Sequence, residues 1–440
     1  MAAASDKARF YLEQYVPELQ EYQQKGIFTR EEITAITSKR SGFEHTLNAR
    51  GSTPADYARY ATYEMNLDGL RKKRRKRLGI KGAKTFNGQR TVFFVLDRAT
   101  KKFPGDMGLW MQYIDFCSKE KASKKLAKVF TSVLRLHPRD SSLWVLAAKH
   151  YAETQGDMGT ARSYFQRGLR FCKDDAKLYL EYARLEMVYL AKLKARKRLL
   201  GLDEERKVQK EEEDDNMITL PSITAEDIDP DAGKGVEEVN EDALKRLESA
   251  PAFTGAIPVA IFDAAMKQFT TSRNAASVAE SFYDLIATFE NVQATPTALQ
   301  HILSYLREHE STSVERSICD AKHELFAVDA QSAEFPPALT KALATIKKGL
   351  GEVPSKSQPL LAEKAALLLL TYSAAANSSE EQLDHDILQV LDVTIKRYLR
   401  ILSKATGPAR KGRLDGLLET LEKNGDQRRV QLQRLALGLA

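Results

Sequence analysis

Residues 106–117 read DMGLWMQYIDFC, residues 140–151 read DSSLWVLAAKHY and residues 175–186 read DAKLYLEYARLE. In each segment an aspartate stands four residues before an aromatic side chain, and Trp110, Trp144 and Tyr179 lie 34 and 35 residues apart. Aspartate is a preferred helix N-cap, because its carboxylate accepts hydrogen bonds from the free N–H groups of the first turn. A fixed period of this length is typical of stacked helical hairpins.

A second helix is predicted in each period. Leu96, Phe130 and Phe165 are again 34 and 35 residues apart, and a proline follows the first two by eight residues and marks a helix end. The same pattern begins earlier, at Thr53 and Pro54. Aromatic residues at spacings of three share one helical face, so we predict that they form the core between hairpins rather than stack on bases. The predicted repeat-core residues are Tyr57, Tyr60, Trp110, Tyr113, Phe130, Trp144, Phe165, Tyr179 and Tyr182.

Composition narrows the function classes. The 440 residues contain three widely spaced cysteines, which favours a reducing compartment, and no secretory signal or membrane-length apolar run is expected. No phosphate-binding loop, dinucleotide fingerprint, zinc-ligand cluster or nucleophile elbow occurs in the sequence. We therefore predict a protein that is not an enzyme, with no catalytic, cofactor-binding or metal site and no small-molecule substrate.

Charge is strongly segregated along the chain. The net charge is +7, although residues 203–248 contain 17 acidic and 6 basic residues, a local net of −11. A run of seven basic residues lies where the first repeat is lengthened, and such runs serve as nuclear-import signals or phosphate contacts. A solvated helix face is the alternative interpretation. The candidate RNA-contact or nuclear-import residues are Arg71, Lys72, Lys73, Arg74, Arg75, Lys76 and Arg77.

Four regions are predicted for an all-α chain. Residues 1–52 form an N-terminal helical docking or cap region. Two amphipathic helices are expected in it, separated at Lys25-Gly26, with Thr29 as the cap of the second. Residues 53–200 form the repeats, with the basic insertion at 69–90. Residues 201–250 are acidic and nearly free of aromatic residues, which favours a flexible linker. Residues 251–440 resume helix-length apolar patterns bounded by prolines, and we interpret them as a degenerate continuation of an α-solenoid. Six such runs predict helices, and closing helices are expected at 414–437. The runs are at 259–269, 278–289, 298–306, 338–346, 360–372 and 388–402.

The repeat pattern resembles that of half-a-tetratricopeptide (HAT) repeats. The first helix fits Trp/Tyr-x-x-Tyr-x-x-Phe/Leu-Glu, and the second contains Ala161, Arg162, Phe165, Arg167 and Leu169. Residues 10–195 further resemble the HAT-repeat subunit family of the UTP-B subcomplex of the small-subunit processome. The segments that carry this resemblance include Val16-Pro-Glu-Leu19, Gly26-Ile-Phe28, Leu109-Trp110, Phe116-Cys117, Lys128-Val-Phe130, Leu143-Trp144 and Lys177-Leu-Tyr179.

This resemblance implies a scaffold that binds UTP-B subunits, β-propeller proteins among them, together with pre-rRNA and snoRNA-containing particles. It also implies a nuclear and nucleolar location, contact with the 5′ external transcribed spacer, and a role in small-subunit rRNA maturation. Two alternatives stay open. One is a HAT-repeat scaffold of mRNA splicing or 3′-end processing, and the other is a direct RNA-binding protein.

Overall fold

The structure is a computed structural model that describes residues 2–80, 88–199, 255–270, 274–378 and 384–403. Within these ranges the secondary structure is entirely helical, which confirms the predicted all-α class. The predicted acidic linker at 201–250 and the last predicted helices, at 414–437, lie outside the described residues. The chain divides into two compact units, Met1–Ala147 and Ala148–Ala440, and the predicted boundaries at residues 52 and 200 stay predictions.

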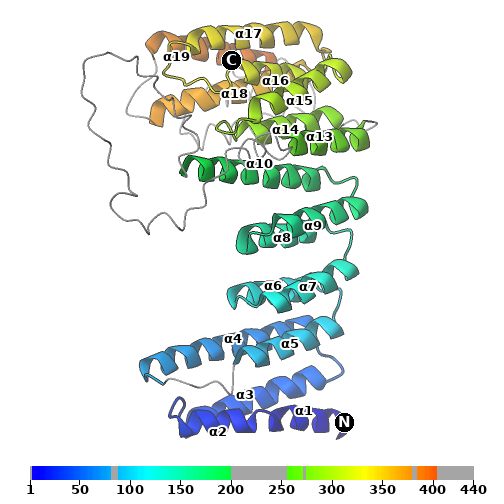
Figure 1. Ribbon diagram of the computed structural model, residues 1–440, viewed down its shortest axis with the longest axis vertical. Coiled ribbons are helices and arrows are strands. Elements are labelled where there is room, and N and C mark those ends of the chain that lie inside the picture. Colours follow the sequence, from blue (N-terminus) through cyan, green and yellow to red (C-terminus); the bar gives the residue numbers. More distant parts are fainter. Residues whose placement is uncertain (1, 81–87, 200–254, 271–273, 379–383, 404–440) are drawn as a thin grey trace, which may run out of the picture. The chain divides into compact units, whose positions relative to one another are not determined.

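Unit 1 contains seven complete helices and the start of an eighth among its described residues. They are α1 (Ala2–Glu13), α2 (Val16–Gln24), α3 (Arg30–Asn48), α4 (Pro54–Arg77), α5 (Gly88–Lys102), α6 (Met107–Lys119), α7 (Ser123–Leu136) and α8 (Ser141–Lys149). Within this unit α4 packs on α5 and α6 on α7 as successive hairpins, while α1 packs on α3 (Figure 1). Asp106 begins α6 as predicted, because its carboxylate accepts from the Leu109 N–H at 2.9 Å.

The N-terminal region differs from its prediction. The pattern indicated two helices separated near Gly26, whereas the structure has three, with the additional break between α1 and α2. Pro17 explains this break, because a proline is tolerated in the first turn of a helix but cannot donate a hydrogen bond in a helix interior. The predicted cap of α3 is confirmed, since the Thr29 hydroxyl accepts from the Glu32 N–H and Glu32 accepts in return from the Thr29 N–H.

Unit 2 begins within α8 and is also helical throughout its described residues. After α8 follow the π-helix η1 (His150–Gln155), α9 (Met158–Phe171), α10 (Ala176–Leu199), α13 (Ala256–Phe269), α14 (Ala275–Ala287), α15 (Thr295–His309), α16 (Val314–Glu324), α17 (Phe335–Glu352), α18 (Gln358–Ser378) and α19 (His385–Ser403). The long helix predicted from Asp175 onward is present as α10, and it packs against α13 and α14.

The π-helix accounts for a change in the repeat period. Trp110 and Phe130 are 20 residues apart, but Trp144 and Phe165 are 21 apart, so the second hairpin carries one extra residue. A π-helix accommodates such an insertion because its hydrogen bonds close over five residues instead of four. Gly156, with φ of 71°, then ends the helix in the left-handed conformation that glycine adopts without steric penalty.

Six of the helices in unit 2 were indicated by apolar runs after residue 253, and α16 was missed. Its sequence is half polar, and it begins at Ser313, whose hydroxyl accepts from the Arg316 N–H at 3.1 Å. Val314, Ile318 and Ala321 are its buried apolar residues and join the core of α17, α18 and α19. Ser317 and Asp320 are buried as well, and α16 packs against α14, α15, α17 and α18, so an apolar run understates how much of this helix is covered.

Candidate interaction site at the basic end of helix α4

Helix α4 carries the predicted basic run on its last turns. It begins with a capping box in which Thr53 and Asp56 bond each other, and Pro54 occupies the first turn. The residues of its inward stripe follow at i, i+3, i+4, i+7, i+11 and i+14, so the stripe is aromatic at the start of the helix and charged at its end. They are Tyr57, Tyr60, Ala61, Glu64, Asp68 and Arg71.

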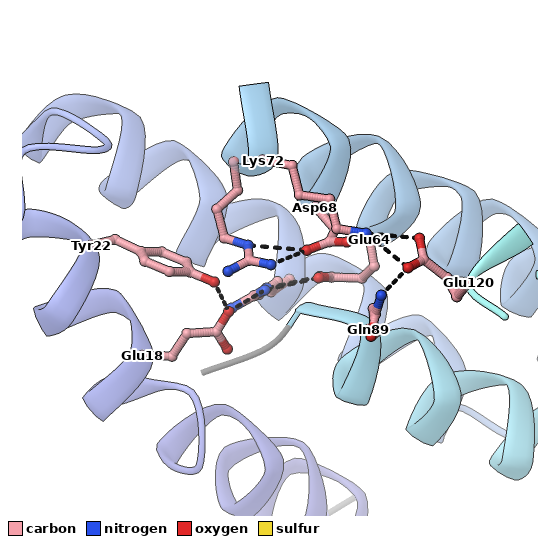
Figure 2. Close-up of polar contacts among 9 residues, drawn as sticks. Glu18, Tyr22, Glu64, Asp68, Lys72, Gln89 and Glu120 are labelled. Atoms are coloured by element: carbon pink, nitrogen blue, oxygen red, sulfur yellow. Dashed lines mark hydrogen bonds and ion pairs between the residues drawn. The ribbon is translucent and has the colours of Figure 1, made fainter. Parts of the chain in front are cut away.

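The centre of unit 1 holds a buried ion pair. Arg40 of α3 donates two hydrogen bonds to the Glu64 carboxylate, both of 2.8 Å, and the side chains are 1% and 2% exposed. Glu18 of α2 lies 3.9 Å from the same guanidinium and accepts a hydrogen bond from the Tyr22 hydroxyl (Figure 2). Burial raises the pKa of the Glu64 carboxyl, although the adjacent Arg40 opposes this rise. The charge of Glu64 is therefore retained in an apolar interior only through its bonds to Arg40.

Two more ion pairs extend this network. Arg98 of α5 donates to both oxygens of the fully buried Glu44 carboxylate, at 2.9 and 3.0 Å. Arg71 of α4 bonds Asp68 one turn earlier at 2.6 Å, and both side chains are 5% exposed or less. Helices α2, α3, α4 and α5 are thus joined by oppositely charged groups that have little access to water, and loss of one partner would leave the other unpaired.

Three residues of the basic run form ion pairs with other residues of the protein. Arg71 is buried against Asp68, as above. Lys72 bonds Asp68 at 2.9 Å and Glu120, beyond the end of α6, at 2.8 Å (Figure 2). Arg74 donates to both oxygens of Glu32 at 2.6 Å and to the Ile27 carbonyl at 3.1 Å. Burial alone would lower the pKa of Lys72, but its bonds to Glu120 and Asp68 raise it.

The other four residues of the run have no ion pair within the described structure. Lys73, Lys76 and Arg77 are exposed, and Arg75 is half-buried. The helix ends immediately after them, where Gly79 has a φ of 65°. The Ile80 N–H donates to the Arg75 carbonyl at 3.2 Å, and the Ile80 side chain packs on a small apolar cluster around Leu19 and Tyr22. Cations at a helix C-terminus are favoured by the helix dipole.

The structure therefore divides the seven basic residues at 71–77, which the sequence pattern does not distinguish, into two groups. An anionic partner could reach Lys73, Arg75, Lys76 and Arg77 without breaking an ion pair of the protein. Lys72 and Arg74 instead bond residues outside α4, and Arg71 is buried against Asp68 of the same helix. Phosphate binding or recognition by an import receptor at the four remaining residues stays a prediction.

All nine predicted repeat-core residues are buried, with at most 6% of any of them exposed. The two tryptophans also form a repeated hydrogen bond: the indole N–H of Trp110 donates to the Pro104 carbonyl at 2.8 Å, and that of Trp144 to the Pro138 carbonyl at 2.9 Å. The carbonyl group of each proline that follows one helix thus accepts a hydrogen bond from the tryptophan of the next helix. Because both indole rings are buried and their N–H groups are bonded, the two tryptophans are not available to stack on bases.

Two classes of site are not indicated by the described residues. No group of three or more histidine, cysteine or acidic side chains in them could hold a metal ion. Cys117, Cys172 and Cys319 are buried and form no disulfide within the described residues. Burial raises the pKa of Cys117 to about 12, which keeps it protonated and unreactive at neutral pH. No helix in the described part of the chain is long and apolar enough to cross a membrane.

The buried ion pairs were missed from the sequence, although a signal for one of them exists. Arg40 and Phe43 are followed by Tyr60 and Glu64, and the same four residue types recur 122 positions later. These are Arg162, Phe165, Tyr182 and Glu186. In both places arginine bonds glutamate, at 2.8 Å and 2.7 Å, and the phenylalanine and tyrosine rings stack. The α3–α4 pair is therefore a repeat contact of the same kind as α9–α10.

Comparison with known proteins identifies relatives for the part of the chain that forms this site. Residues 12–95, which run from the end of α1 into α5, match the family model described as U3 small nucleolar RNA-associated protein 6. The chain is similar to U3 small nucleolar RNA-associated protein 6. The protein of that name from Schizosaccharomyces pombe is 39% identical over 199 residues, which are 44% of this chain and 41% of the relative.

Two further relatives carry the same name with the word homolog. The human protein is 35% identical over 189 residues, 42% of this chain and 32% of the relative. The Dictyostelium discoideum protein is 27% identical over 356 residues, 79% of this chain and 56% of the relative, so this similarity extends beyond unit 1. The matched residues span between a third and just over half of the length of these relatives.

Proposed function

We propose that this chain is a non-enzymatic scaffold of ribosome biogenesis, an α-solenoid of HAT repeats that binds UTP-B subunits and contacts pre-rRNA in the small-subunit processome. Its mechanism is binding: the hairpin surfaces hold protein partners, β-propeller subunits among them. Lys73, Arg75, Lys76 and Arg77 of α4 contact the phosphate backbone of the 5′ external transcribed spacer. The proposed location is the nucleolus.

One observation carries the proposal. The family match at residues 12–95 falls on the helices that the buried ion pairs join, and the same helices present Lys73, Arg75, Lys76 and Arg77 at one end. The relatives are named as associated with U3 small nucleolar RNA, which supports a role in rRNA processing. A rigid helical frame with cations at one edge suits a protein that positions partners and RNA without chemistry.

Affinity purification tests the proposal as a whole. The tagged full chain is recovered from nuclear extract, and the proteins and RNA that co-elute are identified by mass spectrometry and sequencing. We expect β-propeller subunits of UTP-B together with U3 and pre-rRNA. Recovery of splicing or 3′-end processing factors instead would overturn the assignment to the processome and favour the first alternative.

A salt titration tests the RNA contact at α4 separately. Lys73, Lys76 and Arg77 are replaced by glutamine in the full chain, and binding to a single-stranded RNA of mixed sequence is measured across salt concentrations. Each lost phosphate contact should reduce the slope of log affinity against log salt by about 0.7, a total of about 2. The matched control replaces three other exposed cations of unit 1, Arg30, Arg50 and Lys119. An equal change in the control would contradict a specific role for α4.

A further inference from the structure

A second cationic surface of unit 1 lies away from the basic run. A hollow of about 460 Å³ is lined by α5 and α7 together with residues at the start of α6. Four of its lining residues are basic, Lys101, Lys125, Lys128 and Arg135, and the one acidic residue is Asp97. None of them belongs to the run at residues 71–77, and none was among the candidate RNA-contact residues predicted from the sequence.

The carboxylate of Asp97 does not neutralise this surface. Its Oδ1 accepts from the Tyr113 hydroxyl at 2.6 Å, and its Oδ2 pairs with Lys125 Nζ at 2.6 Å. Both carboxylate oxygens of Asp97 therefore have a partner, and its charge neutralises that of Lys125. Lys101, Lys128 and Arg135 are exposed and have no ion pair within the described residues, so the hollow carries three uncompensated positive charges.

The apolar atoms of the hollow are already covered by the protein's own packing. Trp110, Tyr113 and Val129 line it, but they are 4%, 1% and 4% exposed, and the polar atoms of both rings are bonded internally. Leu136, 46% exposed, is the one large apolar side chain that it offers to a ligand. A peptide would need several apolar anchors to bind here, whereas a polyanion needs mainly charge. The surface therefore favours phosphate groups over a protein segment.

We propose that the hollow between α5 and α7 is a second RNA-backbone site, in which Lys101, Lys128 and Arg135 each contact a phosphodiester. The site binds without sequence preference, since no aromatic face is free to stack on a base and recognition of phosphates carries no sequence information. It extends the proposed function by adding a second contact surface for RNA. It does not depend on the contact at α4, because the two sets share no residue.

The test uses the full chain and single-stranded RNA of mixed sequence, titrated across salt concentrations. Replacement of Lys101, Lys128 and Arg135 by glutamine should reduce the slope of log affinity against log salt by about 2, from three contacts of about 0.7 each. Asp97→Asn should act in the opposite direction: it releases Lys125 for a fourth phosphate and steepens the slope by about 0.7. The asparagine oxygen can still accept from Tyr113.

Three results would overturn the proposal. The first is an unchanged slope in the triple variant. The second is an equal loss in the control that replaces Arg30, Arg50 and Lys119, because the effect would then come from net charge alone. The third is no measurable RNA binding by the unmodified chain at low salt. A reduced slope in the α4 variant, with an unchanged slope in the variant of Lys101, Lys128 and Arg135, would reject the second site and leave the proposed function standing. A reduced slope in the second variant alone would reject the contact at α4. Circular dichroism confirms that each variant is folded.

Discussion

The α3–α4 contact of unit 1 and the α9–α10 contact of unit 2 use the same four residue types, but they bury the arginine to different depths. In both, arginine and glutamate are 24 residues apart, and the stacked rings lie 4.9 and 5.0 Å apart. The Arg40 side chain, however, is 1% exposed, whereas that of Arg162 is 27% exposed. The repeat pattern thus determines that an arginine–glutamate pair forms. The residues around the pair determine how much of its arginine is exposed to water.

The difference comes from what covers each arginine. Arg40 lies 4.5 Å below the ring of Tyr15, which precedes α2, and Glu18 of that helix approaches its guanidinium. Arg162 lies 5.3 Å from the ring of Tyr189, which belongs to its partner helix α10. Tyr15 and helix α2 thus bury an arginine whose counterpart in the α9–α10 contact is partly exposed to water. A desolvated charge depends much more strongly on its partner.

The largest expected effect is that of Arg40→Met. It leaves the Glu64 carboxylate buried without its guanidinium, and we expect a loss of about 3–5 kcal/mol of stability. Arg162→Met is the matched change, and there we expect about 1–2 kcal/mol. Arg162 is 27% exposed, so water can take its place beside Glu186, which is itself only 2% exposed. Urea denaturation of the full chain measures both losses. Hydrogen exchange in peptides from α4 and α10 assigns each loss to its unit.

The pH dependence of Arg40→Met checks the cause. Burial already raises the pKa of Glu64, and removal of Arg40 takes away the main opposing influence. A raised folded-state pKa means that the protonated form is favoured in the folded protein. The deficit should therefore be smallest below the unfolded pKa of Glu64 and grow as the pH rises above it. A deficit independent of pH would indicate lost packing rather than an unpaired charge.

A smaller effect is expected when both partners of the buried pair are replaced. Arg40→Met with Glu64→Leu removes the two charges together, and buried ion pairs replaced by apolar residues of similar volume are often close to neutral. We expect the double variant to recover about 2–3 kcal/mol of the loss in Arg40→Met. A double-mutant cycle at Arg162 and Glu186 should give a coupling energy of about 1 kcal/mol or less. Equal coupling at the two sites would contradict the role assigned to the N-terminal cover.

The sequence predicted the features that depend on local periodicity. The aspartate caps, the paired helices and the nine buried aromatic residues follow from side chains that recur on one helical face, and the structure has all of them. The break at Pro17 and the helix α16 were missed because each depends on a short signal, a single proline or a single serine cap. The one-residue insertion was visible as a spacing of 21 instead of 20, but only the structure shows that a π-helix contains it.

The candidate site was harder to predict, because ion pairing depends on neighbours distant in sequence. The run at residues 71–77 is uniform in charge, yet Arg74 meets Glu32 from 42 residues earlier and Lys72 meets Glu120 from 48 residues later. Local spacing contains no information about such partners. The recurrence of arginine, phenylalanine, tyrosine and glutamate after 122 residues was available, but its meaning required a structure in which the members touch.

The smallest expected effect is that of Glu32→Gln, which compares the surface pair Arg74–Glu32 with the buried pair Arg40–Glu64 of the same unit. The bonds from Arg74 and Thr29 lower the pKa of the Glu32 carboxyl to about 2 from an ordinary value of 4.5. A lowered folded-state pKa gives stability that is present above pH 4.5 and is lost as the pH falls toward 2. Since both side chains are about a third exposed, water screens the pair, and we expect only about 0.5–1 kcal/mol. Glu32→Gln should remove this part of the acid sensitivity and leave that of Arg40→Met unchanged. Urea midpoints measured from pH 2 to pH 7 decide the matter, and a Glu32→Gln loss as large as that of Arg40→Met would mean that exposure does not separate the two pairs.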